Sequence, residues 1–221
     1  MWNDLEKGFQ FAFREAWEAY KNSTIPIGVA IMNEADSLMA TGQNQIYTEG
    51  DGLISLHQIA HAEINAILKL SEITDHNIYS KIRTFTLYST MEPCPLCFGA
   101  IVMGSIKNVK YAARDNYAGA AALNDSIAYI RNKKITVTGP FEELEVVQIA
   151  LQTCHEMGRT DNARYIDDSY VISLSDETKA SCQTSDIFYK VYNTLCFCKA
   201  AAFVKFCACF ILQQTIRRKL L

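Results

Sequence analysis

The chain has 221 residues, of which 49% are hydrophobic and 20% are charged. This composition provides a buried core and excludes an intrinsically disordered protein, and the length favours one domain with an appendage over a multi-domain assembly. The 21 basic and 24 acidic residues give a net charge of −3, which argues against a protein that coats nucleic acid.

The first elements are predicted to be a helix and a hairpin. Apolar residues recur at steps of three and four over residues 2–22, which predicts a helix with one face towards a core. The β-branched segment 25–32 and the segment 37–41 predict two strands. Because residues 33–36 form a polar turn between them, the two strands are expected to pair as a hairpin.

The middle of the chain alternates between helices and strands. Residues 42–60 are predicted to form a loop, since glycines and polar residues are mixed there, and residues 61–70 a helix. Residues 83–89 alternate in polarity and predict a third strand. A helix over residues 93–104, with Pro95 in its first turn, and a strand over 109–113 follow.

The last predicted elements are a short helix over residues 126–132, a strand over 135–138 and an amphipathic helix over 141–157 that stops at Gly158. Strands that alternate with helices indicate a sheet with helices on its faces. The crossover between the last two strands allows them to run parallel.

The composition changes beyond Arg159. Residues 160–190 are polar, and residues 191–221 hold five basic residues, no acidic residue and four of the eight cysteines. We therefore divide the chain into a domain over residues 1–159 and a C-terminal extension over residues 160–221. The extension is expected to dock on the body or on a second subunit rather than on a membrane surface.

The cellular compartment is inferred from the amino terminus and the cysteines. The first ten residues carry two acidic residues before an apolar segment could begin, so no secretory signal is expected. The longest purely apolar run, residues 206–212, is too short to span a bilayer. The eight cysteines are therefore expected to be reduced thiols, and the protein to be cytoplasmic.

Two short motifs carry the chemistry of the chain: His61-Ala62-Glu63 and Pro93-Cys94-Pro95-Leu96-Cys97. One imidazole and two thiolates are a common ligand set of catalytic zinc, which keeps a fourth position for water. Cys94 and Cys97 share the first turn of a predicted helix, where the helix dipole favours thiolates. Glu63 is the one carboxylate at the spacing from His61 that would let it take a proton from water.

Two other kinds of site would use some of the same residues. A structural zinc site would need a fourth protein ligand, for which Cys154 and His155 are the candidates. His57 and His61 have the spacing of a metalloprotease pair, but Gln58 stands where that motif requires glutamate, so we reject a metalloprotease.

The sequence resembles the cytidine deaminase superfamily, and within it the branch of bacterial tRNA adenosine deaminases and guanine deaminases. The resemblance is carried by HAEINA at 61–66, MEPCPLCFGAIV at 91–102 and AARDNYAGAA at 112–121, and covers roughly residues 1–158. It implies an α/β protein with the three-layer α/β/α deaminase fold: a mixed central sheet of about five strands with helices on both faces, followed here by the C-terminal extension.

The resemblance also implies roles for individual residues. His61, Cys94 and Cys97 would bind one Zn²⁺ per chain, and Glu63 would be the catalytic proton shuttle. The side chain of Asn44 and the backbone N–H of Ala62 would contact the substrate. The chain departs from the family pattern in the loop between Asn44 and His61, which is longer than in the relatives and differs in sequence.

The expected activity is hydrolytic deamination, in which an amino group on a nucleobase, nucleoside or nucleotide becomes a carbonyl and ammonia is released. A small-molecule substrate is favoured over tRNA, because residues 1–160 hold 13 basic and 18 acidic residues. The first alternative is a tRNA-specific adenosine (wobble A-to-I) deaminase, which the AARDNYAGAA segment favours. The second is a non-catalytic zinc-stabilised interaction module, against which the intact Glu63 counts. We also expect a homodimer.

Overall fold

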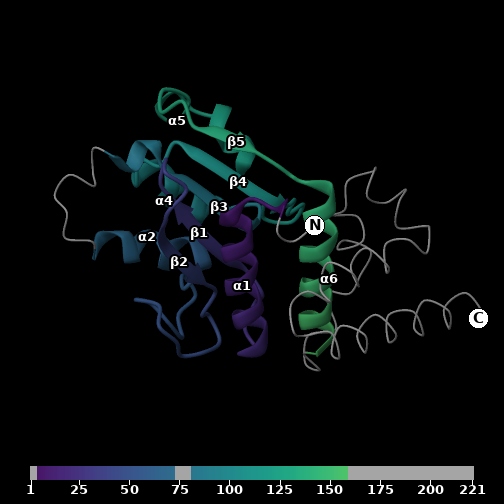
Figure 1. Ribbon diagram of the computed structural model, residues 1–221. Helices are drawn as coiled ribbons and strands as arrows, with labels where there is room; N and C mark the ends of the chain where they lie inside the picture. Colours follow the sequence, from purple (N-terminus) through teal and green to yellow (C-terminus); the bar gives the residue numbers. More distant parts are fainter. Residues whose placement is uncertain (1–3, 73–80, 159–221) are drawn as a thin grey trace, which may run out of the picture.

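A five-stranded mixed sheet lies at the centre of the protein, with helices on both of its faces (Figure 1). The computed structural model describes residues 4–72 and 81–158. This arrangement confirms the predicted α/β fold with a three-layer architecture. The predicted C-terminal extension, residues 160–221, lies outside the described residues.

The sheet has the strand order β2-β1-β3-β4-β5. β1 pairs antiparallel with both β2 and β3, whereas β3 with β4 and β4 with β5 pair parallel, as predicted for the last two strands. The strands are β1 Gly28–Met32, β2 Leu38–Gln43, β3 Thr86–Met91, β4 Asn108–Ala113 and β5 Thr136–Thr138.

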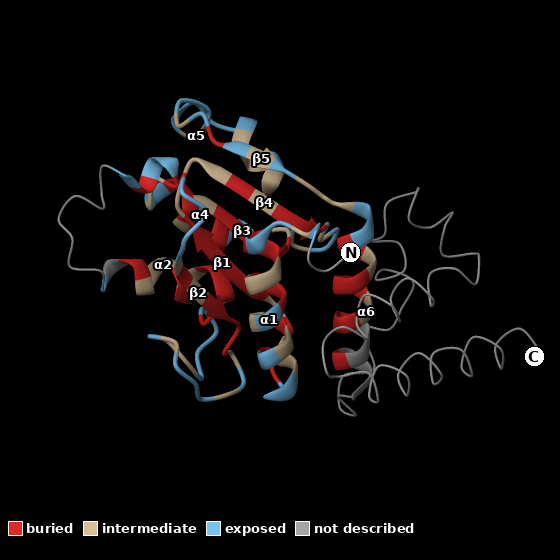
Figure 2. Ribbon diagram, in the orientation of Figure 1, coloured by how far each residue is buried: buried red, intermediate tan, exposed pale blue. Residues whose placement is uncertain are grey.

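Side chains that alternate along the strands divide the core into two layers, because successive residues of a strand point to opposite faces. On one face, Ala30 and Met32 of β1 pack with aromatic residues of α1 (Lys7–Lys21) and with α6 (Glu142–Gly158). On the other face, Val29 and Ile31 pack with α2 (Ala62–Ser71) and α4 (Pro95–Met103). Figure 2 shows the resulting band of buried residues along the central strands.

Two glycines let helices approach the sheet closely. A Cβ atom on Gly28 would lie 2.1 Å from the carbonyl oxygen of Ala12 in α1, and one on Gly42 would lie 2.2 Å from that of Ala62 in α2. Both distances are far below van der Waals contact, so a larger residue would displace the helix. Gly42 therefore fixes how near α2 lies to β2.

Some predicted boundaries are wrong, and tertiary contacts explain two of them. Residues 2 and 3 of the first predicted helix lie outside the described residues, and the helix begins at Lys7, because Glu6 is not helical and its carboxylate accepts the Tyr88 hydroxyl at 2.8 Å and pairs with Lys110 at 2.6 Å. The first strand begins at Gly28 rather than at residue 25, since the N–H of Ile27 closes a tight turn on the carbonyl of Ile25 at 2.8 Å.

Short helices account for three further differences. The 3₁₀ turn η2 (Ile82–Thr84) replaces the start of the third predicted strand. The 3₁₀ helix η3 (Ala121–Asp125) was not predicted, and α5 (Ala128–Arg131) is shorter than the predicted helix over 126–132.

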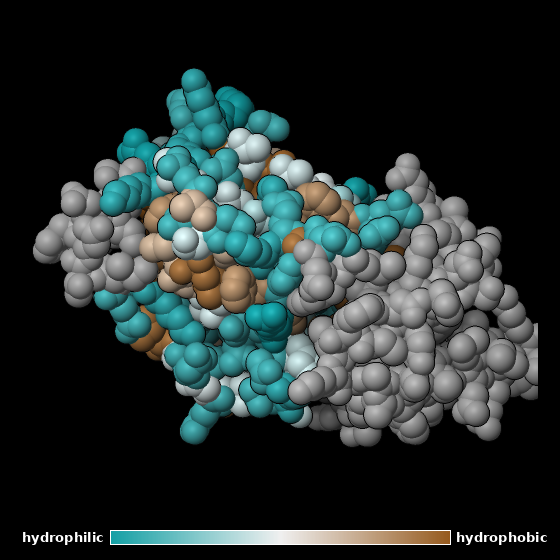
Figure 3. Space-filling model, in the orientation of Figure 1, coloured by the Kyte–Doolittle hydropathy of each residue, from teal (hydrophilic) through white to brown (hydrophobic). Residues whose placement is uncertain are grey.

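On the side of the molecule drawn in Figure 3, hydrophilic residues surround a smaller central group of hydrophobic ones. Tyr117 and Met103 are the most exposed large hydrophobic residues of the described part, at 86% and 69%. Within residues 4–72 and 81–158, none of the helices combines the length and the hydropathy that a membrane span requires.

Candidate metal centre

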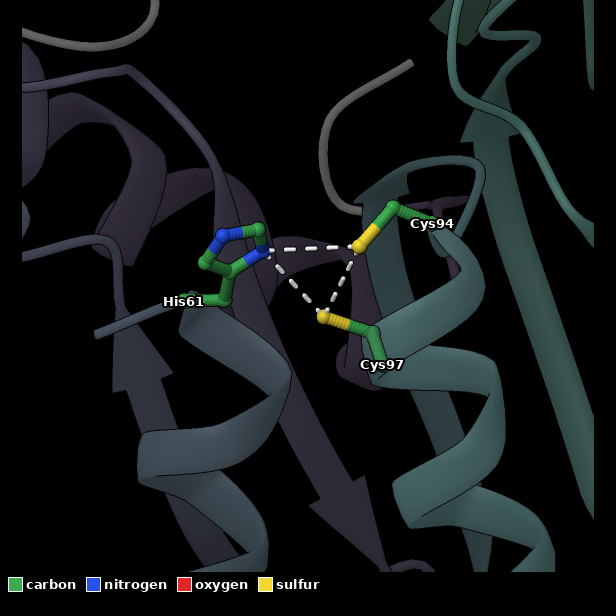
Figure 4. A group of neighbouring side chains, drawn as sticks. All are labelled: His61, Cys94 and Cys97. Atoms are coloured by element: carbon green, nitrogen blue, oxygen red, sulfur yellow. Dashed lines mark hydrogen bonds between the residues drawn. The ribbon is translucent and has the colours of Figure 1, made fainter. Parts of the chain in front are cut away.

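The amino-terminal ends of α2 and α4 meet beside the sheet and bring the two sequence motifs together (Figure 4). His61 immediately precedes α2, Cys94 immediately precedes α4, and Cys97 lies in the first turn of α4. Pro95 is the first residue of α4, as predicted, where its missing N–H removes no helical hydrogen bond.

The three donor atoms form a compact triangle. Nδ1 of His61 lies 3.6 Å from Sγ of Cys94 and 3.4 Å from Sγ of Cys97, and the two sulfurs are 3.6 Å apart. A tetrahedral zinc ion with ordinary bond lengths separates such donors by about 3.6–3.8 Å. The donor set and its spacing therefore fit one Zn²⁺ without rearrangement.

Three protein ligands, rather than four, are found in this cluster. Among the described side chains, no further histidine, cysteine or carboxylate joins His61, Cys94 and Cys97. His155, a candidate fourth ligand of a structural site, is buried on α6 and is not part of the cluster. The side chain of Cys154 lies outside the described residues. Three protein donors are the number that catalytic zinc sites use, whereas structural sites use four.

The three donor groups differ in their affinity for a proton. Hydrogen bonds with Cys97 and His61 lower the pKa of Cys94 to about 4. The hydrogen bond with Cys94, followed by burial, raises the pKa of Cys97, and the hydrogen bond with Cys94 raises the pKa of His61. A bound divalent cation would favour the deprotonated form of all three groups.

Glu63 lies beside the metal cluster and is almost fully buried, at 4% exposure. The hydroxyl of Ser89, on β3, donates a hydrogen bond to Oε1 of Glu63 at 3.2 Å. Burial raises the pKa of the Glu63 carboxyl group, because removal from water disfavours the charged form. A carboxylate with a raised pKa accepts a proton more readily than a surface glutamate does.

Asn44 directly follows β2, and its side chain is 2% exposed. Its Oδ1 accepts hydrogen bonds from the Thr24 hydroxyl at 3.0 Å and from the N–H of Ile46 at 3.1 Å. These bonds fix the orientation of the amide, and within the described part its Nδ2 makes no hydrogen bond. Asn44 is therefore prepared to donate to a ligand.

The long loop before His61 is held on α2. The buried side chain of Asn65 accepts the N–H of Ile54 and donates to the carbonyl of Ile54, both at 3.1 Å. Ala62 opens the same helix, so its N–H belongs to the first turn, whose donors have no acceptor within the helix.

The sequence predicted His61, Glu63, Cys94 and Cys97 as site residues, and the structure brings the first and the last two together. The sequence did not point to Ser89 and Thr24, which form hydrogen bonds with Glu63 and Asn44. Hydroxyl residues on a strand or in a turn carry no spacing that distinguishes them. Only the fold brings these residues to their partners: Ser89 on β3 lies beside Glu63, and Thr24 before β1 lies beside Asn44.

Known proteins resemble this chain in sequence and in fold. The family profile described as "Cytidine and deoxycytidylate deaminase zinc-binding region" matches residues 3–113, which include His61, Glu63 and both cysteines of the cluster. The guanine deaminase of Bacillus subtilis is 36% identical over 104 residues, which cover 47% of this chain and 60% of that protein. The tRNA-specific adenosine deaminase of Haemophilus influenzae is 32% identical over 116 residues, which cover 52% of this chain and 61% of that protein.

The solved structure of a guanine deaminase from Nitrosomonas europaea superposes with a TM-score of 0.54 at 20% identity and covers 68% of this chain and 83% of that one. This likeness concerns the fold. The aligned part spans about three fifths of the length of the two curated relatives.

Proposed function

Because the chain belongs to the cytidine and deoxycytidylate deaminase zinc-binding family, we propose that it is a hydrolase that deaminates nucleobases, nucleosides or nucleotides. The observation that carries the proposal is the buried Glu63 beside a cluster of three metal-binding side chains. A structural zinc site has no use for such a carboxylate, which counts against a non-catalytic interaction module.

His61, Cys94 and Cys97 are the proposed ligands of one Zn²⁺. When bound, zinc acts as a Lewis acid that lowers the pKa of water. Glu63 takes a proton from the attacking water and delivers protons to a ring nitrogen and then to the departing ammonia. The ring carbon gains the oxygen of water and loses the amino group, so the product carries a carbonyl.

Substrate contacts are assigned to Asn44 and Ala62. Both would act as donors: Nδ2 of Asn44 because its Oδ1 is occupied, and the N–H of Ala62 because it opens α2. Two donors select a ligand with acceptors, such as a ring nitrogen or a ring carbonyl, on the edge that faces them. Base recognition would therefore depend on hydrogen-bond complementarity rather than on charge.

A free base, nucleoside or nucleotide is the favoured substrate. The loop between Asn44 and His61 contains Glu49 and Asp51 and no lysine or arginine, which makes it a poor surface for RNA phosphates. The alternative, deamination of adenosine in tRNA, is supported by the Haemophilus influenzae relative and by the AARDNYAGAA segment at 112–121.

Assembly and location belong to the same proposal. We expect a homodimer, because α4 leaves apolar residues exposed: Leu96 at 41% and Met103 at 69%. A cytoplasmic location suits a site that needs Cys94 and Cys97 as reduced thiols. Residues 1–159 would form the deaminase domain, with the extension 160–221 contributing to assembly.

Ammonia release tests the proposed reaction. The zinc-loaded protein should release ammonia from at least one of guanine, cytosine, their nucleosides and an adenosine-containing stem-loop RNA. Glu63→Gln keeps the shape of the side chain but removes the base, so turnover should fall by about two to four orders of magnitude while zinc stays bound. Glu18→Gln, a surface variant on α1, is the control. Near-normal turnover of Glu63→Gln would refute the proton-shuttle role.

A further inference from the structure

A backbone hydrogen bond links the proposed substrate residue Asn44 to the proposed zinc ligand His61. The N–H of Gln45 donates to the carbonyl of Ala60 at 2.8 Å. Gln45 follows Asn44 and Ala60 precedes His61, so each of the two site residues is one residue away from this bond. Residues 46–59, here called the β2–α2 loop, are therefore closed at their base beside the metal cluster.

The side chain of Asn65 joins this base to α2. Asn65 lies one turn after His61, whose carbonyl accepts its N–H at 3.0 Å, and it is completely buried. Its Nδ2 donates to the carbonyl of Gln43 and to Oε1 of Gln45, each at 3.3 Å. The same amide pairs with the backbone of Ile54, as described above. One side chain thus contacts the end of β2, the base of the β2–α2 loop and its middle.

Gln45 connects Asn65 to the amide of Asn44. The side chain of Gln45 is fully buried, and its Oε1 accepts from Asn65. The next residue, Ile46, donates its N–H to Oδ1 of Asn44 at 3.1 Å, which is one of the two bonds that fix the Asn44 amide. A displacement of Gln45 therefore moves the donor that orients Asn44.

Two glycines let the β2–α2 loop close over the amides of Gln45 and Asn65. A Cβ atom on Gly50 or Gly52 would overlap the side-chain amide of Gln45, and one on Gly52 would also lie 2.7 Å from Cγ of Asn65. A larger residue at either position would displace these amides. The loop and the two buried amides therefore form one packed unit, and a buried polar network whose members are paired favours a single arrangement.

We propose that Asn65 is a positioning residue of the proposed deaminase: it holds Asn44 at a fixed position relative to His61, so that the donor to the substrate and the metal centre stay in register. The inference rests on the proposed function. Among the described residues, the hydrogen bonds of the Asn65 side chain go to Gln43, Gln45 and Ile54 and to no member of the metal cluster. Asn65 therefore acts through Gln45.

Steady-state kinetics and metal analysis of Asn65→Ala test this role. Guanine, cytosine and an adenosine-containing stem-loop RNA are the probes, and the fastest one is used for all variants. A displaced Asn44 amide weakens binding of the substrate, so KM should rise about tenfold while kcat changes by less than about threefold. Zinc content should stay at one per chain, because the three ligands are untouched.

Asn108→Ala is the matched control. The Asn108 amide also donates to backbone carbonyls, those of Thr84 and Phe85, but it lies at the start of β4. Because β4 runs parallel to β3, whose end leads to Cys94, this is the end of the sheet away from the metal cluster. Asn108→Ala should lower the melting temperature without changing KM or zinc content.

Coupling to Asn44 separates positioning from general stabilisation. Asn44→Ala alone should raise KM, and adding Asn65→Ala should raise it no further, whereas independent effects would multiply. Amide hydrogen exchange gives a measurement that does not depend on turnover. In Asn65→Ala the N–H groups of Gln45 and Ile46 should exchange about tenfold or more faster than in Asn108→Ala.

Gln45→Ala decides the question if Asn65→Ala fails to fold. This variant removes the side-chain acceptor of Asn65 but keeps the backbone bond to Ala60, and it must raise KM in the same way. An active wild type with unchanged KM in the folded variant would overturn the role of Asn65, and so would a loss of zinc. Multiplying effects in the double variant would overturn action through Asn44.

Failure of the proposed function gives a different result. Absence of ammonia release from every probe by the wild type would refute the deaminase activity, and the positioning role with it. Exchange of Gln45 and Ile46 that is the same in Asn65→Ala as in Asn108→Ala would refute the positioning role even in an active enzyme.

Discussion

At the residue scale, the three donor groups of the cluster differ in their affinity for a proton. The pKa of Cys94 is lowered to about 4, whereas the pKa values of Cys97 and His61 are raised. Zinc binds thiolates and neutral imidazole, so binding at neutral pH must displace the proton of Cys97 and any proton on His61.

Zinc binding is therefore expected to release protons, about one or more per ion at pH 7, and zinc affinity should rise with pH. The sign follows from the raised pKa values: the apo protein holds these protons over a wider pH range, so acid competes with the metal. Calorimetric titration of the apo protein in two buffers with different ionisation enthalpies measures the number released. A heat that is the same in both buffers would contradict the expectation.

Loss of one proposed ligand should remove the metal. A site with three protein ligands does not keep its affinity without a thiolate, so purified Cys94→Ala should contain far less than the one zinc per chain expected of the wild type. Cys154→Ala is the matched control, because Cys154 was the alternative ligand of a structural site. Metal analysis that finds full zinc in Cys94→Ala, or a loss only in Cys154→Ala, would reverse the assignment.

The residues of the metal cluster could be predicted from the sequence, and those that orient the neighbouring groups could not. Ligand chemistry restricts residue types and spacing, so Cys94 and Cys97 on one helical turn are recognisable without a structure. Thr24 and Ser89 each act through a hydrogen bond to a side chain 20 or more residues away. Such pairings depend on tertiary placement, which leaves no local pattern.

At the scale of elements, the site depends on where two helices begin relative to the sheet. α2 carries His61 at its start and packs on β2 across Gly42, and α4 begins immediately after Cys94. Periodicity predicted the type of these helices correctly, and their boundaries within two residues. The predicted start of α1 was less accurate, because Glu6 contacts Tyr88 and Lys110 and the helix begins only after it, at Lys7.

Displacing α2 should damage both stability and the site. In Gly42→Ala the new methyl group would lie 2.2 Å from the carbonyl oxygen of Ala62, so α2 must shift. Overpacking of this kind costs about 1–3 kcal/mol in the free energy of unfolding, and zinc affinity should fall with it. Urea denaturation and zinc titration measure the two effects.

Gly99→Ala is the control for the same substitution at another glycine. Gly99 lies within α4, and no atom lies within 4 Å of the position of a Cβ there. Alanine favours helix over glycine by about 0.5–1 kcal/mol, so this variant should be as stable as the wild type or more stable. If Gly42→Ala matched the wild type in both measurements, the close approach of α2 to β2 would not matter to the site.

At the scale of the whole molecule, the net charge of the protein favours a free base or nucleoside over an RNA stem-loop as the substrate. Residues 1–160 carry a net charge of −5 from 13 basic and 18 acidic residues, and Lys69 on α2 pairs with Asp51 at 3.0 Å. The dense basic cluster Arg217-Arg218-Lys219 stands at the end of the extension, outside the described residues. An RNA stem-loop needs several phosphates neutralised, whereas a free base is held by hydrogen bonds in a pocket.

The dependence of kcat/KM on salt concentration therefore distinguishes a free base or nucleoside from a stem-loop RNA as the substrate. For a free base or nucleoside, kcat/KM of the full chain should change by less than about twofold between about 50 and 300 mM salt, because no net charge is neutralised on binding. For a stem-loop RNA that engages several phosphates, kcat/KM should fall by about two or more orders of magnitude over the same range. We expect the free compound to be the better substrate at every salt concentration. Efficient, salt-sensitive deamination of adenosine in the stem-loop, without activity on free bases and nucleosides, would establish the tRNA alternative and would require that cations of the extension, or of a second subunit, reach the site.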